Sequence, residues 1–198
     1  MDFTDELLEV MASSSRIARH IHAPLQSGSN RILRKMRRKD RAQDYSKRVF
    51  AAFRLMPDAA FGADVMVGFP SETDQDFEET RLLIDSLPFT YLHVFPFSRR
   101  PDTPADNVRG QVHGSVVRKR SLILRDLIAK INLVFQEKQI GITHFVLTLH
   151  EFTANGRSAL TGNYLKVTLS GERIPVNQLF TVKIKALLNF GLVAEPIP

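Results

Sequence analysis

A chain of 198 residues, 43% of them hydrophobic, is long enough for one well-packed domain, or for one domain and a smaller one. It contains no cysteine, which excludes disulfides and excludes thiolate ligands for zinc or for an iron–sulfur cluster. No stretch is long and apolar enough to span a bilayer and no signal-peptide pattern follows Met1, so we expect a cytoplasmic protein without a membrane partner.

The net charge of +6 hides a strong segregation of charge along the chain. Residues 31–54 carry ten basic and two acidic residues, whereas residues 58–87 carry eight acidic residues and one basic residue. Residues 99–138 are basic again. Such blocks suit an anionic partner such as nucleic acid, although a solvated helix face is the favoured explanation of any single block.

The first part of the chain alternates helical and extended patterns. Thr4 is placed to cap a first helix, and residues 19–25 form a short extended stretch that ends in polar turn residues. Two further helices are expected, a short one that ends near Met36 and a longer one over residues 42–56. These elements lead into the central strand of the domain.

Residues 60–80 predict a strand, a turn and the start of a helix. Residues 63–69 are mostly small or apolar, as in a parallel strand that is covered on both faces. Gly68 and Pro70 break this run, and Thr73 is a suitable N-cap for the following helix. Turns at the carboxyl ends of such strands are where α/β folds bind ligands.

A second strand is expected over residues 90–97, followed by a proline-containing loop and by a long helix over residues 112–140. Residues 1–140 therefore predict an α/β domain that forms part of a parallel barrel or sheet. The remainder, residues 141–198, predicts a small all-β barrel of the oligonucleotide-binding (OB) type. Its expected β-rich runs, separated by Gly and Asn turns, are 143–151, 160–169, 179–188 and 192–197.

Four short motifs stand out in this chain: HIHAPLQSGS at 20–29, DVMVGFPSET at 64–73, HVFPFSRRPDT at 93–103 and LTGNY at 160–164. Together, and in this order, they resemble the C-terminal part of the radical S-adenosylmethionine (SAM) methylthiotransferases. The last motif is similar to the small RNA-binding barrel of these enzymes, the TRAM domain. HVFPFS and LTGNYLKV look most like the branch that methylthiolates threonylcarbamoyladenosine beside the tRNA anticodon.

The resemblance implies a parent enzyme that uses SAM and 4Fe-4S clusters. In the family, a cluster held by three cysteines cleaves SAM to a radical, and an auxiliary cluster takes part in sulfur insertion. This chain has neither those cysteines nor the family's N-terminal domain. We therefore expect a fragment, a partial (β/α) barrel of radical SAM type plus a TRAM domain, with tRNA, SAM and the missing N-terminal domain as partners and no radical chemistry on its own.

Two other functions remain open at this point. The chain could be a standalone RNA-binding remnant without catalysis, or it could come from the branch of the family that modifies a ribosomal protein.

The resemblance also indicates which residues bind the cofactor. The expected SAM-binding residues are Gln26, Ser27, Gly28, Val67, Gly68, Phe69 and Glu72. For the first three the motif favours ligand contact, with ordinary turn chemistry as the alternative. For Glu72 the equally weighted alternative is the stabilisation of an acidic residue at a helix start.

RNA contacts are expected from the loop after the second strand and from the β-barrel. The expected residues are Arg99, Arg100, Tyr164, Lys166, Lys183 and Lys185. Arginines and lysines would hold phosphates, and an exposed tyrosine would stack on a base. The alternatives are a solvated loop for the arginines and a place in the barrel core for Tyr164.

His20, His22 and His93 raise the possibility of a metal site. Their spacing is that of strands and no carboxylate cluster accompanies them in sequence, so no metal site is expected. Two other positions depart from the family pattern, because Ser71 and Asp102 stand where the family usually has glycine. If these positions need a positive φ, each substitution costs on the order of 1 kcal/mol.

Overall fold

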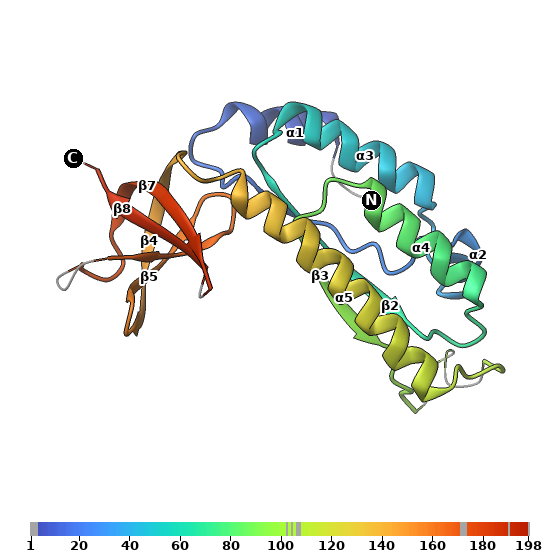
Figure 1. The fold of residues 1–198 in the computed structure, drawn as a ribbon. Helices are drawn as coiled ribbons and strands as arrows, with labels where there is room; N and C mark the ends of the chain where they lie inside the picture. Colours follow the sequence, from blue (N-terminus) through green and yellow to red (C-terminus); the bar gives the residue numbers. More distant parts are fainter. Residues whose placement is uncertain are drawn as a thin grey trace. The chain divides into compact units, whose positions relative to one another are not determined.

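The computed structural model describes residues 4–101, 103, 105, 108–170, 174–189 and 191–197. It is a mixed α/β structure with a three-stranded sheet and a closed five-stranded barrel (Figure 1). The contacts divide the chain into a sheet unit, residues 1–13 and 21–131, and a barrel unit, residues 14–20 and 132–198. The division falls within the long helix α5 (Gly114–Glu137). The domain boundary at residue 140 stays a prediction.

The predicted helices and strands of the first 140 residues are present, with ends that differ by a few residues. In chain order they are α1 (Asp5–Ser13), β1 (His20–His22), α2 (Asn30–Lys35), α3 (Ala42–Leu55), β2 (Ala60–Val67), α4 (Asp74–Ser86), β3 (Tyr91–Pro96) and α5. The strands are ordered β1-β2-β3 in the sheet. β2 and β3 are parallel, and their register places Asp64 beside His93.

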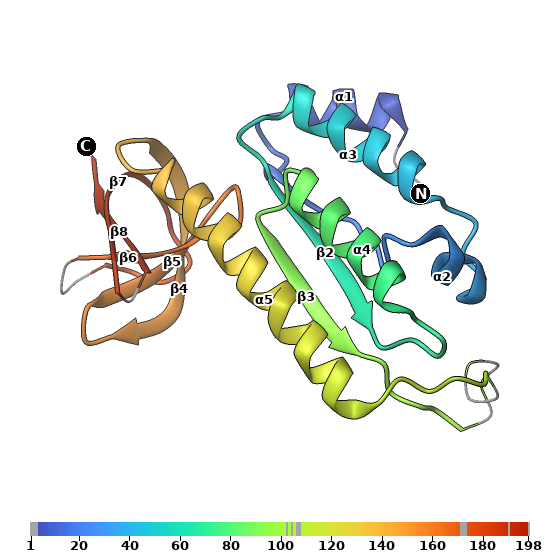
Figure 2. The same cartoon turned by 45° about the vertical axis from the view of Figure 1, so that its right-hand side comes forward.

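The two faces of β2 have different surroundings. Phe61, Ala63, Val65 and Val67 are buried in a core to which α3, α4 and α5 contribute. Figures 1 and 2 show α4 between α3 and α5. Side chains alternate along a strand, so Asp64 and Met66 lie on the opposite face, and both are only partly buried. One face of the sheet therefore holds the hydrophobic core, and the other presents polar and apolar side chains outward.

The predicted N-cap of helix α4, Thr73, is confirmed, and it forms a capping box with Asp76. The Thr73 side chain accepts a hydrogen bond from the backbone N–H of Asp76, and the Asp76 carboxylate accepts one from the backbone N–H of Thr73. Each bond satisfies a backbone donor that the first helical turn leaves free. The cap fixes where the turn after β2 ends and the helix starts.

The barrel unit contains β4 (Thr143–Thr153), β5 (Gly156–Thr161), β6 (Lys166–Leu169), β7 (Leu179–Leu188) and β8 (Gly191–Pro196), in the closed order β4-β5-β6-β8-β7. The prediction of one β-run over 160–169 is wrong, because β5 and β6 are separate antiparallel strands. Tyr164 between them has a φ of 64°, which an extended strand cannot accommodate. No helix in the described part of the chain has both the length and the apolar character that crossing a membrane requires.

Candidate functional site

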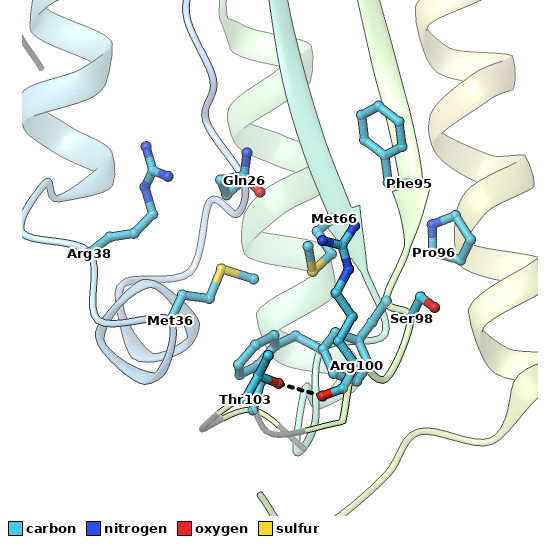
Figure 3. A pocket seen from close by; sticks show the side chains of 12 residues that line it. Gln26, Met36, Arg38, Met66, Phe95, Pro96, Ser98, Arg100 and Thr103 are labelled. Atoms are coloured by element: carbon cyan, nitrogen blue, oxygen red, sulfur yellow. Dashed lines mark hydrogen bonds between the residues drawn. The ribbon is translucent and has the colours of Figure 1, made fainter. Parts of the chain in front are cut away.

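A cavity of about 540 Å³ lies near the carboxyl ends of the parallel strands β2 and β3. Its apolar lining consists mainly of Met36, Met66, Phe69, Phe95 and Phe97, and its polar lining of Gln26, Arg38, Ser98, Arg100 and Thr103. Figure 3 shows these side chains, with Met66 from β2 and with Phe95 and Pro96 from β3. Both the volume and the mixture of apolar walls with a few polar groups are typical of a small-molecule site.

Gln26 reaches the cavity because its backbone continues the sheet beyond β1. Its N–H donates to the carbonyl of Asp64 at 2.7 Å, and its own carbonyl accepts from the N–H of Met66 at 2.9 Å. Gln26 has a φ of 68°, in the left-handed region that residues other than glycine seldom adopt. A strained backbone at the end of a parallel strand often marks a functional position.

Of the seven predicted SAM-binding residues, Gln26 and Phe69 line this cavity and the other five do not. Ser27 is fully buried, and its hydroxyl lies 3.2 Å from that of Thr80 in α4. The N–H of Gly28 donates to the same Thr80 hydroxyl at 2.9 Å. A Cβ on Gly28 would lie 2.6 Å from the Cα of Thr80, so a glycine is needed for this close approach.

The turn after β2 is also fixed by contacts with residues of α5. Val67 is fully buried, and Gly68 has a φ of 76° at a place where a Cβ would lie 2.4 Å from the Val117 side chain. The Glu72 carboxylate accepts a hydrogen bond from the Gly68 N–H at 2.8 Å and pairs with Arg120 at 2.6 Å. Burial raises the pKa of Glu72, and the bonds from Gly68 and Arg120 oppose this effect. In this structure Glu72 shapes the turn.

Ser71 occupies the left-handed region, with a φ of 69°. This position therefore does need a positive φ, and serine occupies it where glycine would be unstrained. The N–H of Ser71 donates to the carbonyl of Gly110 at 2.6 Å, which joins the turn to the loop before α5. The second departure from the family pattern, Asp102, lies outside the described residues.

Asp76 connects the acidic helix α4 to the basic segment before it. Its carboxylate pairs with Arg31 and accepts from the hydroxyl of Ser29 at 2.7 Å and from that of Thr73 at 2.6 Å. Burial by itself would raise the pKa of Asp76, but the hydrogen bonds from Arg31, Thr73 and Ser29 outweigh it and lower the pKa. Part of the charge segregation along the chain therefore serves internal pairing.

The predicted RNA-binding residues are exposed or partly exposed. Arg99 and Arg100 lie in the loop after β3, where Arg100 lines the cavity. Tyr164 is 52% exposed, so its alternative place in the barrel core is wrong. Its ring stacks on His20 at a centroid distance of 4.1 Å within the barrel unit. Among the lysines, Lys166 pairs with Glu151, Lys185 pairs with Glu195, and Lys183 is exposed on β7.

Two groups of residues near the sheet were missed from the sequence. The aromatic residues at the end of β3 were predicted only as part of a strand and not as cavity-lining residues. Side chains alternate along the strand, which places Phe95 on the outward face with His93. The structure also places the Asp64 carboxylate within 3.2 Å of both His22 and His93. This single carboxylate belongs to the neighbouring strand β2, so its position beside two of the three histidines is not apparent from their spacing in the sequence. Strand alternation could have placed Phe95 on the outward face, whereas the contact between Asp64 and the histidines depends on the register of the strands.

Comparison with known proteins agrees with the four motifs. Residues 1–84 match the family model of the Radical SAM superfamily. The chain is 37% identical over 188 residues to the threonylcarbamoyladenosine tRNA methylthiotransferase of Bacillus subtilis. This match covers 91% of this chain and 41% of that protein. For the Thermotoga maritima protein of the same name the identity is 31% over 193 residues, covering 98% of this chain and 44% of that protein.

A second branch also matches. The tRNA-2-methylthio-N(6)-dimethylallyladenosine synthase of Thermobifida fusca is 41% identical over 140 residues, which are 71% of this chain and 28% of that protein. The chain thus spans less than half of the length of these relatives. The resemblance drawn from the motifs is confirmed: the chain is homologous to the radical SAM tRNA methylthiotransferases, a family of enzymes.

Proposed function

We propose that this chain is part of a cytoplasmic methylthiotransferase that acts on threonylcarbamoyladenosine in tRNA. Relatives that carry this name match 91% and 98% of the chain, including the barrel, whereas the dimethylallyladenosine relative from Thermobifida fusca matches 71%. On this proposal the three-stranded sheet is part of a radical SAM barrel, and the five-stranded barrel is a TRAM-type domain that binds RNA. The missing N-terminal domain and its clusters would belong to the full-length parent.

The observation that carries the proposal is the cavity at the strand ends. Ligands of parallel α/β folds bind at this edge, and Gln26 and Phe69 bring two of the family-like motifs to it. SAM combines an adenine ring, which suits walls formed by Phe69 and Phe97, with a carboxylate, which suits Arg38 or Arg100. The residues present therefore fit SAM.

The same residues do not fit an iron–sulfur cluster. Such clusters are held mainly by cysteine thiolates, and this chain contains no cysteine. We therefore assign no step of radical chemistry to its own residues. Its share is to bind SAM at the strand ends and to bind RNA through the barrel and the basic loop.

The cofactor part is tested by calorimetric titration of the whole chain with SAM. Gln26→Gly is the informative variant, because glycine accepts a φ of 68° and removes only the amide side chain. We expect about fivefold weaker binding, the equivalent of one lost hydrogen bond of ~1 kcal/mol. The control is Ser71→Gly, which also relieves a positive φ but at a residue that does not line the cavity. It should leave the affinity for SAM unchanged. Equal affinities for Gln26→Gly and the parent chain would contradict the placement of SAM.

The RNA part is tested by the salt dependence of binding to a tRNA anticodon arm. Counterion release predicts that the logarithm of the binding constant falls linearly with the logarithm of salt concentration. Lys183→Gln should reduce this slope by about 0.7 to 0.9, which corresponds to one phosphate contact. Lys130→Gln, an exposed lysine on α5, is the control and should leave the slope unchanged. If binding does not depend on salt concentration, the proposed RNA interface is contradicted, while the SAM result is unaffected.

A further inference from the structure

Three side chains converge on the outward face of the sheet, one from each strand. His22 comes from β1, Asp64 from β2 and His93 from β3, and the last two are register partners. The Nε2 atom of His22 and the Nδ1 atom of His93 each lie 3.2 Å from Oδ1 of Asp64. The three potential ligand atoms all lie within 4.8 Å of one another. Three donor atoms thus surround one point in front of the sheet.

The two distances to Asp64 fit a bound transition-metal ion. Metal–ligand bonds of about 2.0–2.1 Å at tetrahedral angles place neighbouring ligand atoms about 3.3–3.4 Å apart, which is close to both 3.2 Å distances. Two imidazoles and one carboxylate suit zinc or iron(II), whereas calcium and magnesium prefer oxygen ligands alone. A set of three protein ligands also leaves a coordination position open for water or another ligand.

A second layer of contacts orients His22. The Nδ1 atom of His22 lies 3.0 Å from the hydroxyl of Tyr91, and the two rings stack at a centroid distance of 5.8 Å. When Nδ1–H donates to this hydroxyl, Nε2 keeps its lone pair on the side of Asp64. Tyr91 lies across Gly62, where a Cβ would come within 2.0 Å of its ring. A glycine on β2 therefore makes room for the group that orients the histidine.

The charge at this point also favours a cation. Asp64 is partly buried, with 25% of its side chain exposed, and the groups that it contacts are the two histidines. No lysine or arginine pairs with Asp64 among the residues that the structure describes. The negative charge of this carboxylate is therefore available to a positive ion.

We propose that His22, Asp64 and His93 bind one divalent first-row transition-metal ion, with zinc as the best match to the donor set. This site is separate from the SAM cavity, since none of its three residues lines that cavity. It also needs neither tRNA nor the N-terminal domain of the proposed parent enzyme, so it stands independently of the proposed function. The open position faces away from the hydrophobic core, where an external ligand can reach it.

The site is tested on the whole chain after removal of metals with a chelator. Calorimetric titration with zinc chloride should give one ion per chain, and cobalt(II) should give the intense visible bands of a tetrahedral site. His93→Asn and Asp64→Asn should each weaken binding at least tenfold. The control is His150→Asn, which changes an exposed histidine on β4 outside the cluster and should leave the affinity unchanged.

Folding of each variant is checked by circular dichroism and thermal unfolding. His93 is the safest position, because 56% of its side chain is exposed and its loss leaves the core intact. Tyr91→Phe removes the hydroxyl beside His22 and should weaken zinc binding by up to about tenfold. The proposal is overturned if a folded His93→Asn chain binds zinc as tightly as the parent, or if cobalt(II) gives only the weak spectrum of an octahedral aqua ion.

Discussion

The carboxylate of Glu72 joins the backbone of Gly68 to the guanidinium of Arg120, and all three groups are buried. The pair of charges is therefore part of the turn that follows β2. Arg120 also donates to Asp74 at 2.7 Å, but that carboxylate is 97% exposed. One arginine thus has one buried and one solvated partner on the same turn.

This arrangement predicts a large difference between two similar substitutions. Glu72→Gln leaves the buried charge of Arg120 without its buried partner and should lower the free energy of unfolding by about 3 kcal/mol. Asp74→Asn removes the solvated partner and should cost about 0.5 kcal/mol or less. Urea unfolding measures both values. Similar losses for the two variants would show that burial does not set the strength of this pair.

Ser71→Gly should stabilise the chain. Glycine adopts a φ of 69° without the steric cost that serine meets, so the free energy of unfolding should rise by about 1 kcal/mol. The same substitution in the middle of helix α3, Ser46→Gly, should have the opposite sign and cost about 0.5 kcal/mol. Thermal unfolding of the two variants tests the backbone argument, which fails if both shift the melting temperature in one direction.

Acid should destabilise the chain through Asp76. Its folded-state pKa lies below the ordinary value of 3.8, so the ionised form contributes stability above about pH 4, and this contribution is lost as the pH falls below 3.8. Asp76→Asn should be less stable than the parent by about 2 kcal/mol at pH 7, and the difference should shrink between pH 4 and pH 2. Urea unfolding over this pH range measures it, with the exposed Asp85→Asn as control. A difference that stays constant with pH would assign the effect to packing.

The three-stranded sheet predicts limited solubility. Its edge strands β1 and β3 leave backbone donors and acceptors that another strand can pair with, whereas the barrel is closed. We therefore expect the isolated chain to aggregate or to be only marginally stable. Light scattering during thermal unfolding tests this expectation. A sharp, reversible transition of a monomer at high temperature would contradict it.

Local sequence patterns predicted most of the helices and strands. The apolar runs, the cap at Thr73 and the turn glycines predicted the helices and strands of the sheet unit, because these signals act within a few residues. The division of 160–169 into β5 and β6 was missed, because a left-handed residue such as Tyr164 has no clear signature in sequence.

The candidate sites were harder to predict, because their residues meet only through the register of neighbouring strands. The pairing of Asp64 with His93 follows from how β2 and β3 align, and nothing within either strand specifies that alignment. The contact of Glu72 with Arg120 is equally hard to predict, because Arg120 lies far away in the sequence on α5. Motifs located the carboxyl ends of the strands but did not show which side chains point outward.

The contact between Gly62 and Tyr91 has an evolutionary consequence. A Cβ at position 62 would overlap the tyrosine ring, so the two positions are not free to vary independently. Lineages that acquire a larger residue at 62 must give up the large ring at 91, and with it the hydroxyl beside His22. The two positions should therefore change together among homologues, and chains that keep glycine and tyrosine should also keep the two histidines and the aspartate.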